Sequence, residues 1–212
     1  MTEPAVPQFS APLSDGDPTR LTADEQIEGC AFRGAIPVLR REHLEVDGCT
    51  FTGCLFPACA LHGARITDVV FRNCDLSNVD WQGSCLQRVR FETCKLLGAG
   101  FAEATLRDVS FVGCKAPLAS FALLRARQVR FEGCGLHGAA FDACRLERTA
   151  FDGCDLTESD FSGTRLRGIS FASCDIRGLR VREIDSYELK GLKINRLQAL
   201  DLIRLLGVEI ED

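Results

Sequence analysis

An apolar residue occupies every fifth position of this 212-residue chain from Val46 to Val181, which gives 28 consecutive centres in one register. A second small or medium-sized residue stands two positions before most centres, as Cys74 does before Leu76. A period of five fits neither the 3.6 residues of a helical turn nor the two of a strand, so it indicates a repeat architecture. Each unit is therefore expected to bury two side chains and expose three.

A longer period of 20 residues lies on top of the first. Four five-residue units, each turning through a right angle, would close one square coil, so residues 20 apart would stack. Phenylalanine and cysteine both recur at this spacing. We therefore predict an all-β solenoid, a quadrilateral β-helix of about seven coils, from two series of stacked residues: Phe51, Phe71, Phe91, Phe111, Phe131, Phe151 and Phe171, and Cys54, Cys74, Cys94, Cys114, Cys134, Cys154 and Cys174.

The repeat resembles that of the pentapeptide-repeat family, in which a small residue and an acid or Asn precede a central Leu or Phe and two polar residues follow it. The tripeptides CDL, VDW, SDF and CDI at residues 74–76, 79–81, 159–161 and 174–176 fit this consensus. The resemblance covers about two thirds of the chain. It implies that the β-helix is right-handed.

The pattern divides the chain into four parts. Residues 1–20 carry three prolines before position 13, so we expect a flexible N-terminal segment. In residues 21–45 the spacing from Phe32 to Phe51 is 19 residues, one short of a coil, and we expect an N-terminal cap with irregular repeats. Residues 46–186 form the β-helix. Residues 187–212 form a C-terminal helical cap and dimerisation segment.

The segment from Asn195 to Gly207 predicts a short α-helix, with Asn195 as N-cap and Gly207 as C-terminal stop. It has more apolar surface than one packed face requires. Part of this surface is expected to cap the last coil and the rest to join two copies in a twofold dimer. A purely intramolecular cap is the alternative. The residues expected in the dimer interface are Leu197, Leu200, Ile203 and Leu206.

The cysteines and histidines predict neither a metal site nor a cofactor. Ten of the 12 cysteines stand at the inward small position, where free thiols act as small apolar side chains. No CxxC pair occurs, and His43, His62 and His137 lack zinc-ligand spacing. The N-terminus lacks the basic and apolar regions of a signal peptide, and no run of 18 apolar residues is present. We therefore expect a cytoplasmic protein with no membrane contact.

The outward positions predict a rod with two electrical sides. The two adjacent walls centred on residues 56 and 61 and their successors, here called the acidic walls, carry seven acids against Lys95 and Lys115. The wall centred on residue 66 and its successors, here called the Arg wall, carries nine arginines against Asp68, Asp108 and Glu147. The seven residues expected to bind a partner are Asp75, Asp80, Glu103, Asp142, Asp155, Glu158 and Asp160.

Within the family, the chain is most similar to the MfpA and Qnr group of fluoroquinolone-resistance proteins, in its size, its free-standing rod and its Leu-rich C-terminal helix. This resemblance implies a homodimer joined through the C-terminus that mimics DNA. It would bind DNA gyrase or topoisomerase IV, and inhibit the enzyme or protect it from poisons, with no direct contact to nucleic acid. The alternative is a non-catalytic scaffold or interaction rod with an unrelated protein partner. An enzyme is not expected, because no paired carboxylates, activated nucleophile or phosphate-binding loop is evident.

Overall fold

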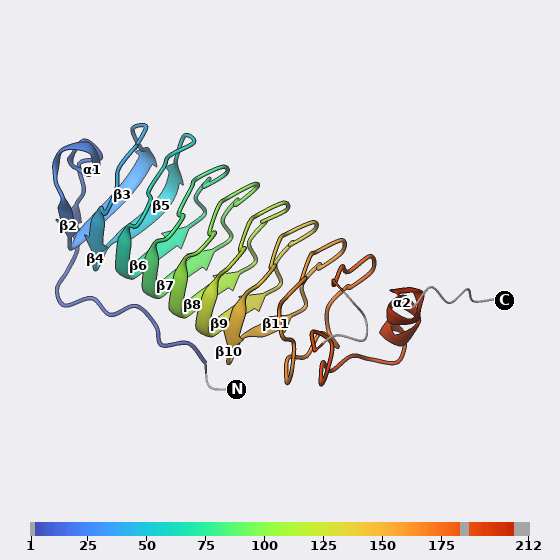
Figure 1. Ribbon diagram of the computed structural model, residues 1–212. Coiled ribbons are helices and arrows are strands. Elements are labelled where there is room, and N and C mark those ends of the chain that lie inside the picture. The colour runs from blue at the N-terminus through green and yellow to red at the C-terminus, as the bar shows by residue number, and fades with distance from the viewer. Residues whose placement is uncertain (1–2, 183–186, 206–212) are drawn as a thin grey trace.

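The structure is a computed structural model that describes residues 3–182 and 187–205. The chain winds into a rod of stacked coils, a right-handed β-solenoid of about seven turns (Figure 1). All strand pairs within the described residues are parallel, as continuous winding in one direction requires. The fold predicted from the five-residue period is confirmed.

Long strands form two adjoining walls of the coil, and isolated bridges such as Asp75 with Lys95 join the coils on the other two. The described elements in chain order are β1 (Ser14–Asp15), α1 (Arg20–Ala23), β2 (Gln26–Glu28), β3 (Cys30–Ala35), β4 (Glu45–Asp47), β5 (Thr50–Leu55), β6 (Arg65–Arg72), β7 (Cys85–Glu92), β8 (Thr105–Val112), β9 (Arg125–Glu132), β10 (Arg145–Glu147), β11 (Ala150–Asp152) and α2 (Gln198–Leu205).

The pairing register shows where the 20-residue coil begins and ends. Ile27 pairs with Val46, and Phe32 with Phe51, at an offset of 19 residues, so β2 and β3 form a coil one residue short. The register shifts between Arg33 and Ala35, and from there the offset is 20. At the other end, Ser170 pairs with Lys193, so the last coil is three residues longer than the rest.

Two columns of aromatic rings fill the core from opposite walls. In one column, the rings from Phe32 to Phe151 stack nearly parallel, as Phe91 and Phe111 do at 4.7 Å between centroids and 2° between planes. The second column runs from Trp81 to Phe161 and meets the first edge to face, with Phe131 and Phe141 at 5.8 Å and 90°. Both arrangements are favourable for aromatic pairs. Burial of these rings supplies much of the apolar stabilisation of each coil.

The inward small positions hold thiols and hydroxyls that bond to the preceding coil. The Cys94 thiol donates to the Phe71 carbonyl at 3.4 Å, and the Ser84 hydroxyl donates to the Leu61 carbonyl at 2.8 Å. All 12 cysteines are free, and Cys85 alone is exposed. Burial raises the pKa of the Cys144 thiol to about 12, so this thiol stays protonated at neutral pH.

Each coil turns its corners at the second residue after a centre, where the backbone adopts positive φ. Glycine occupies many of these corners, including Gly113 at +60° and Gly133 at +58°, because it has no Cβ to clash in this region. Non-glycine residues hold the same conformation at other corners, such as Leu123 at +58° and Arg148 at +51°. The corner is therefore a backbone constraint whatever residue occupies it.

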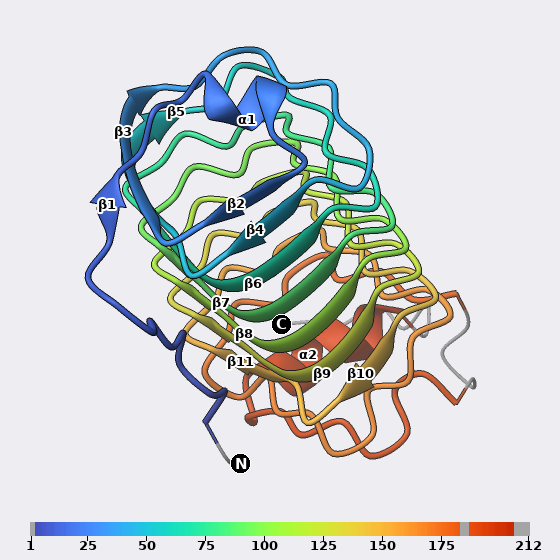
Figure 2. The same cartoon turned by 90° about the vertical axis from the view of Figure 1, so that its left-hand side faces the viewer.

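Residues 3–13 run along the outside of the rod, from the first coil to the level of β9 (Figures 1 and 2). Gln8 donates its backbone N–H to Asp68 at 2.8 Å, Ala5 donates to Asp108 at 3.1 Å, and Glu3 pairs with Arg130 at 2.8 Å. The expected flexible segment thus has specific contacts along the length of the rod. Its mobility stays a prediction.

The helix α2 packs on the last coil through its first turn. Asn195 is the N-cap, since its side-chain oxygen accepts the backbone N–H groups of Leu197 and Gln198. Gln198 is buried and donates its amide to the carbonyls of Phe171 and Cys174. The expected helix and its N-cap are confirmed, and Gly207 lies outside the described residues.

We expect Gly133→Ala to lower the free energy of unfolding by about 1 kcal/mol, because alanine is strained at positive φ. Gly135→Ala is the matched control. Neither added Cβ would meet an atom within 4 Å, but Gly135 does not have positive φ. Equilibrium urea denaturation measures both variants, and equal losses of stability would contradict the corner constraint.

Candidate partner-binding surface

The acidic walls expected from the sequence are divided into two groups of acids along the rod. Bridges place Asp75 beside Lys95, then Lys95 beside Lys115, so two lysines interrupt the ladder after the first group. Further along, the bridges join Gly135 to Asp155 on one wall and Ala140 to Asp160 on the other. The structure therefore does not form one continuous acidic strip.

Neighbouring side chains contact all three acids nearer the N-terminus. The Asp75 carboxylate lies 3.6 Å from the Lys95 ammonium, and the hydroxyl and backbone N–H of Ser77 donate to it. These hydrogen bonds, with a smaller contribution from Lys95, lower the pKa of Asp75. Asp80 bonds to His62 at 2.8 Å, and Gln82 donates to Glu103 at 3.1 Å. Asp75 is thus paired with a lysine, whereas Glu103 is bonded, among the described residues, only to a neutral amide.

The second group, nearer the C-terminus, has four acids, of which Asp142 and Asp155 have no ion pair among the described residues. The described residues provide neither a hydrogen bond nor an ion pair for the Asp142 carboxylate. Asp155 is exposed, and among the described residues its carboxylate bonds only to Thr157. Glu158 stands on a corner with His137 at 3.9 Å. Asp160 lies 4.0 Å from Arg180. We name Asp142, Asp155, Glu158 and Asp160 the C-terminal acidic group.

Several of these aspartates also stabilise the coil itself. An aspartate immediately before a centre accepts the backbone N–H of the residue after that centre, as Asp80 does from Gln82 at 3.0 Å and Asp160 from Ser162 at 2.9 Å. The same bond forms from Thr157 to Asp155 at 3.0 Å. Such local bonds favour aspartate in turns. Part of the acidity therefore has a structural cause independent of any partner.

The Arg wall contains arginines without acidic partners. Within residues 3–182 and 187–205, no ion pair or hydrogen-bond acceptor contacts the side chains of Arg107, Arg125, Arg127 or Arg145. All four are exposed. Strand pairing places Arg107 beside Arg127, and Arg125 beside Arg145. Like charges on neighbouring strands repel each other, so an anionic partner would relieve this cost.

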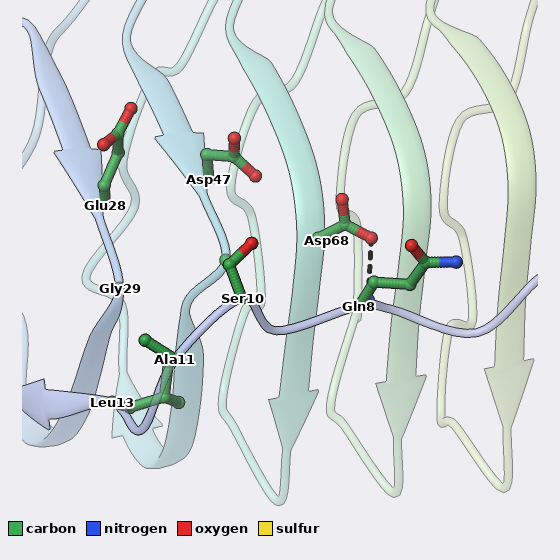
Figure 3. Close-up of a pocket in the computed structure, with 9 residues that line it drawn as sticks. Gln8, Ser10, Ala11, Leu13, Glu28, Gly29, Asp47 and Asp68 are labelled. Atoms are coloured by element: carbon green, nitrogen blue, oxygen red, sulfur yellow. Dashed lines mark hydrogen bonds between the residues drawn. The ribbon is translucent and has the colours of Figure 1, made fainter.

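A shallow pocket of about 300 Å³ lies where the N-terminal segment crosses the edge of the Arg wall (Figure 3). Asp68, at its border, is only 7% exposed and binds Arg88 at 2.7 and 2.5 Å as well as Gln8. Burial raises the pKa of Asp68, but the Arg88 and Gln8 hydrogen bonds outweigh this and lower it. No sequence pattern predicts this contact, because Gln8 and Asp68 are 60 residues apart.

The expected dimer residues are only partly described. Leu197 is 79% exposed and Leu200 is 48% exposed, whereas Ile203 is half-buried. Leu206 lies outside the described residues. The two exposed leucines are available to a partner, and their role in a dimer stays a prediction.

Family profiles match both halves of the repeat. Residues 47–83 match the profile described as pentapeptide repeats (8 copies), and residues 124–202 match the profile described as pentapeptide repeat region. The chain belongs to the pentapeptide-repeat family. This confirms the resemblance drawn from the sequence.

Solved pentapeptide-repeat structures are similar to this chain in fold. A trypsin-treated form of QnrB1, a plasmid-mediated fluoroquinolone resistance protein, is 23% identical, with a TM-score of 0.47 and coverage of 93% of this chain and 96% of that chain. HetL, involved in heterocyst differentiation regulation in the cyanobacterium Nostoc sp. strain PCC 7120, is 14% identical, with a TM-score of 0.37 and coverage of 79% and 88%. At these identities the similarity concerns the fold alone.

No curated relative was found for the chain, and neither a membrane-spanning helix nor a metal cluster was found in the part of the chain that the structure describes. No curated protein matches the chain. In the part of the chain that the structure describes, no helix has the length and apolarity needed to cross a bilayer. The same residues contain no cluster of three or more His, Cys, Asp or Glu side chains that could hold a metal ion.

We expect Asp155→Ala to lower the free energy of unfolding by about 0.5–1 kcal/mol, because it removes two hydrogen bonds at a turn. Asp142→Ala, on the neighbouring wall, should leave stability unchanged, since its carboxylate has no described partner. Thermal unfolding measures both. If Asp142→Ala were the more destabilising variant, the assigned hydrogen bonds would not be what stabilises this part of the rod.

Proposed function

We propose that this pentapeptide-repeat protein is a non-catalytic, DNA-mimicking ligand of a type II topoisomerase, DNA gyrase or topoisomerase IV. It would inhibit the enzyme or protect it from topoisomerase poisons. The family alone does not decide this function, because its members have unrelated roles. The proposal rests on the surface of this chain and on its sequence resemblance to the MfpA and Qnr group.

The observation that carries the proposal is the C-terminal acidic group. Its four carboxylates stand on adjacent walls of a straight rod, and Asp142 and Asp155 have no ion pair among the described residues. DNA-binding grooves derive much of their affinity from phosphate charge, so a rigid surface of exposed carboxylates can compete for them. The acids nearer the N-terminus contribute less, because Asp75 is paired with Lys95.

The alternative is a scaffold rod that binds an unrelated protein. The Arg wall favours it, since uncompensated arginines have no place in a surface that imitates phosphate. The two functions predict different results in a topoisomerase assay.

We expect reversal of the C-terminal acidic group, Asp142→Lys, Asp155→Lys, Glu158→Lys and Asp160→Lys together, to abolish inhibition or protection of DNA gyrase. The four lysines would repel a groove built for phosphate. Supercoiling assays with and without a gyrase poison measure the effect, and binding should weaken as salt rises.

The matched control reverses four exposed acids at the N-terminal end of the rod, Asp15, Asp17, Glu25 and Glu42, and so produces the same change in net charge. This control should retain activity. Unchanged inhibition by the first variant would contradict DNA mimicry, and no effect of the unaltered protein on either topoisomerase would favour the scaffold.

We also propose that the C-terminal segment joins two copies through Leu197, Leu200, Ile203 and Leu206. In 1 M NaCl, where charge pairing between rods is screened, Leu200→Asp with Ile203→Asp should then reduce the mass measured by sedimentation equilibrium from dimer to monomer, because charges would be buried in an apolar contact. Arg196→Asp, an exposed position before the helix, is the control. A dimer that survives the double substitution would place the contact elsewhere.

A further inference from the structure

The Arg wall changes sign along the rod. Seven described strands lie side by side on this wall, in the order β2, β4, β6, β7, β8, β9 and β10 (Figure 2). Its first two strands carry Glu28, Glu45 and Asp47, and its last three carry arginines. The sequence-based Arg wall missed this acidic end, because it began at the centre at residue 66 and so left out β2 and β4.

The charges at the two ends are open to solvent. Asp47 is exposed, and its carboxylate has no described partner. Glu45 lies 3.6 Å from Arg65, with 46% of its side chain exposed. At the other end, Arg125 and Arg127 are both exposed and unpaired within the described residues. One wall thus has an acidic end and a basic end, separated by about four coil spacings of ~4.8 Å.

Such a wall is complementary to itself. A twofold axis that runs along the central strand, between two facing walls, reverses the order of the coils but keeps each column of side chains opposite the same column. Strand β4 of one copy then faces β9 of the other. Because the strands have a common spacing on both copies, Glu45 comes opposite Arg125, and Asp47 comes opposite Arg127, twice in the dimer.

We propose that two copies of this chain pair side by side and antiparallel through the Arg wall. The contact is isologous and closes on itself, as most homodimer contacts do. The alignment also opposes like charges: Glu28 with Glu147 at each end and, at the corners, Asp68 with Asp108 and Arg88 with Arg88 of the other copy. The pairing places carboxylates opposite Arg125 and Arg127 and so relieves the repulsion between neighbouring arginines. The spacing of the strands is the same on both copies, so the opposite charges stay aligned. The acidic wall that carries Asp155 lies on the opposite side of the rod and stays open in both copies.

Cys85 lies at the centre of this contact. It begins β7, the middle strand of the seven, and it is the exposed member of the 12 cysteines. The wall is hollowed there by a shallow pocket of about 280 Å³, lined in part by Cys85, Gln87 and Thr105, and no acid lines this pocket. On the proposed axis, Cys85 of one copy faces Cys85 of the other, so a natural thiol reports on the pairing.

The first test is cross-linking of the full chain by a short bismaleimide, which adds to both thiols without an oxidant. To exclude the C-terminal contact, the background is Leu200→Asp with Ile203→Asp. We expect rapid formation of a covalent dimer at low salt, and about tenfold less in 1 M NaCl, where the Debye length is about 3 Å. In the control Cys85→Ser with Ser120→Cys, the thiol moves to an acidic wall, and cross-linking should fall to the level of random collision.

The second test exchanges charges. Glu45→Arg with Asp47→Arg should lose the cross-link, and so should Arg125→Glu with Arg127→Glu, because each variant then opposes like charges. An equimolar mixture of the two variants should restore it, since the heterodimer again opposes unlike charges at both ends. A general loss of folding cannot produce such rescue.

Two results would overturn the proposal: equal cross-linking of the Cys85 and Ser120→Cys proteins, or no rescue in the mixture. Binding of duplex DNA by the unaltered protein, lost in Arg125→Glu with Arg127→Glu, combined with no pairing, would overturn it in favour of a nucleic-acid surface. The inference is independent of topoisomerase binding, because the thiol and charge-exchange measurements contain no enzyme.

Discussion

Backbone hydrogen bonding between coils, at a fixed offset of 20 residues, is the constraint on which the other features depend. The Leu96 N–H donates to the Lys115 carbonyl, and the Lys115 N–H donates to the Cys94 carbonyl, so each coil is held by the next. This offset stacks the aromatic rings and aligns the inward thiols. It also favours positive φ at the corners, because a coil that turned elsewhere would lose its partners. The backbone therefore fixes the conformation at each position, and the side chain only has to be compatible with it.

The sequence was sufficient to predict this backbone, because a period repeated over 28 units excludes every common alternative. The period alone places Phe91 and Cys94 inward, and both are buried in the core. The features that escaped prediction are those with no period. The contact of Gln8 with Asp68 joins a proline-rich segment to a corner 60 residues away. The 19-residue spacing from Phe32 to Phe51 showed that the first coil is one residue short. The spacing alone could not show that the register shifts near Gly34.

In the candidate site, too, the sequence predicted the periodic features but not the individual contacts. The sequence identified the acids of the acidic walls correctly as outward residues, but it could not show which of them are compensated. Lys95 neutralises Asp75 because the coils stack them, and His62 contacts Asp80 for the same reason. A count of charges by wall treats all seven acids alike. In the described residues, the C-terminal acidic group has the most unpaired carboxylates of the acidic walls. It is therefore the surface proposed to bind the partner.

The walls of such a rod face different directions, so each wall can bind a different partner. Carboxylates that compete with phosphate must stay exposed, and exposed arginines on the same molecule would repel a cationic groove. Covering Arg125 and Arg127 with the acidic end of a second copy reduces this conflict without any change in the acidic walls. Self-pairing through one wall and partner binding through the opposite wall are therefore compatible. The paired rods would present carboxylates to a topoisomerase on both outer sides.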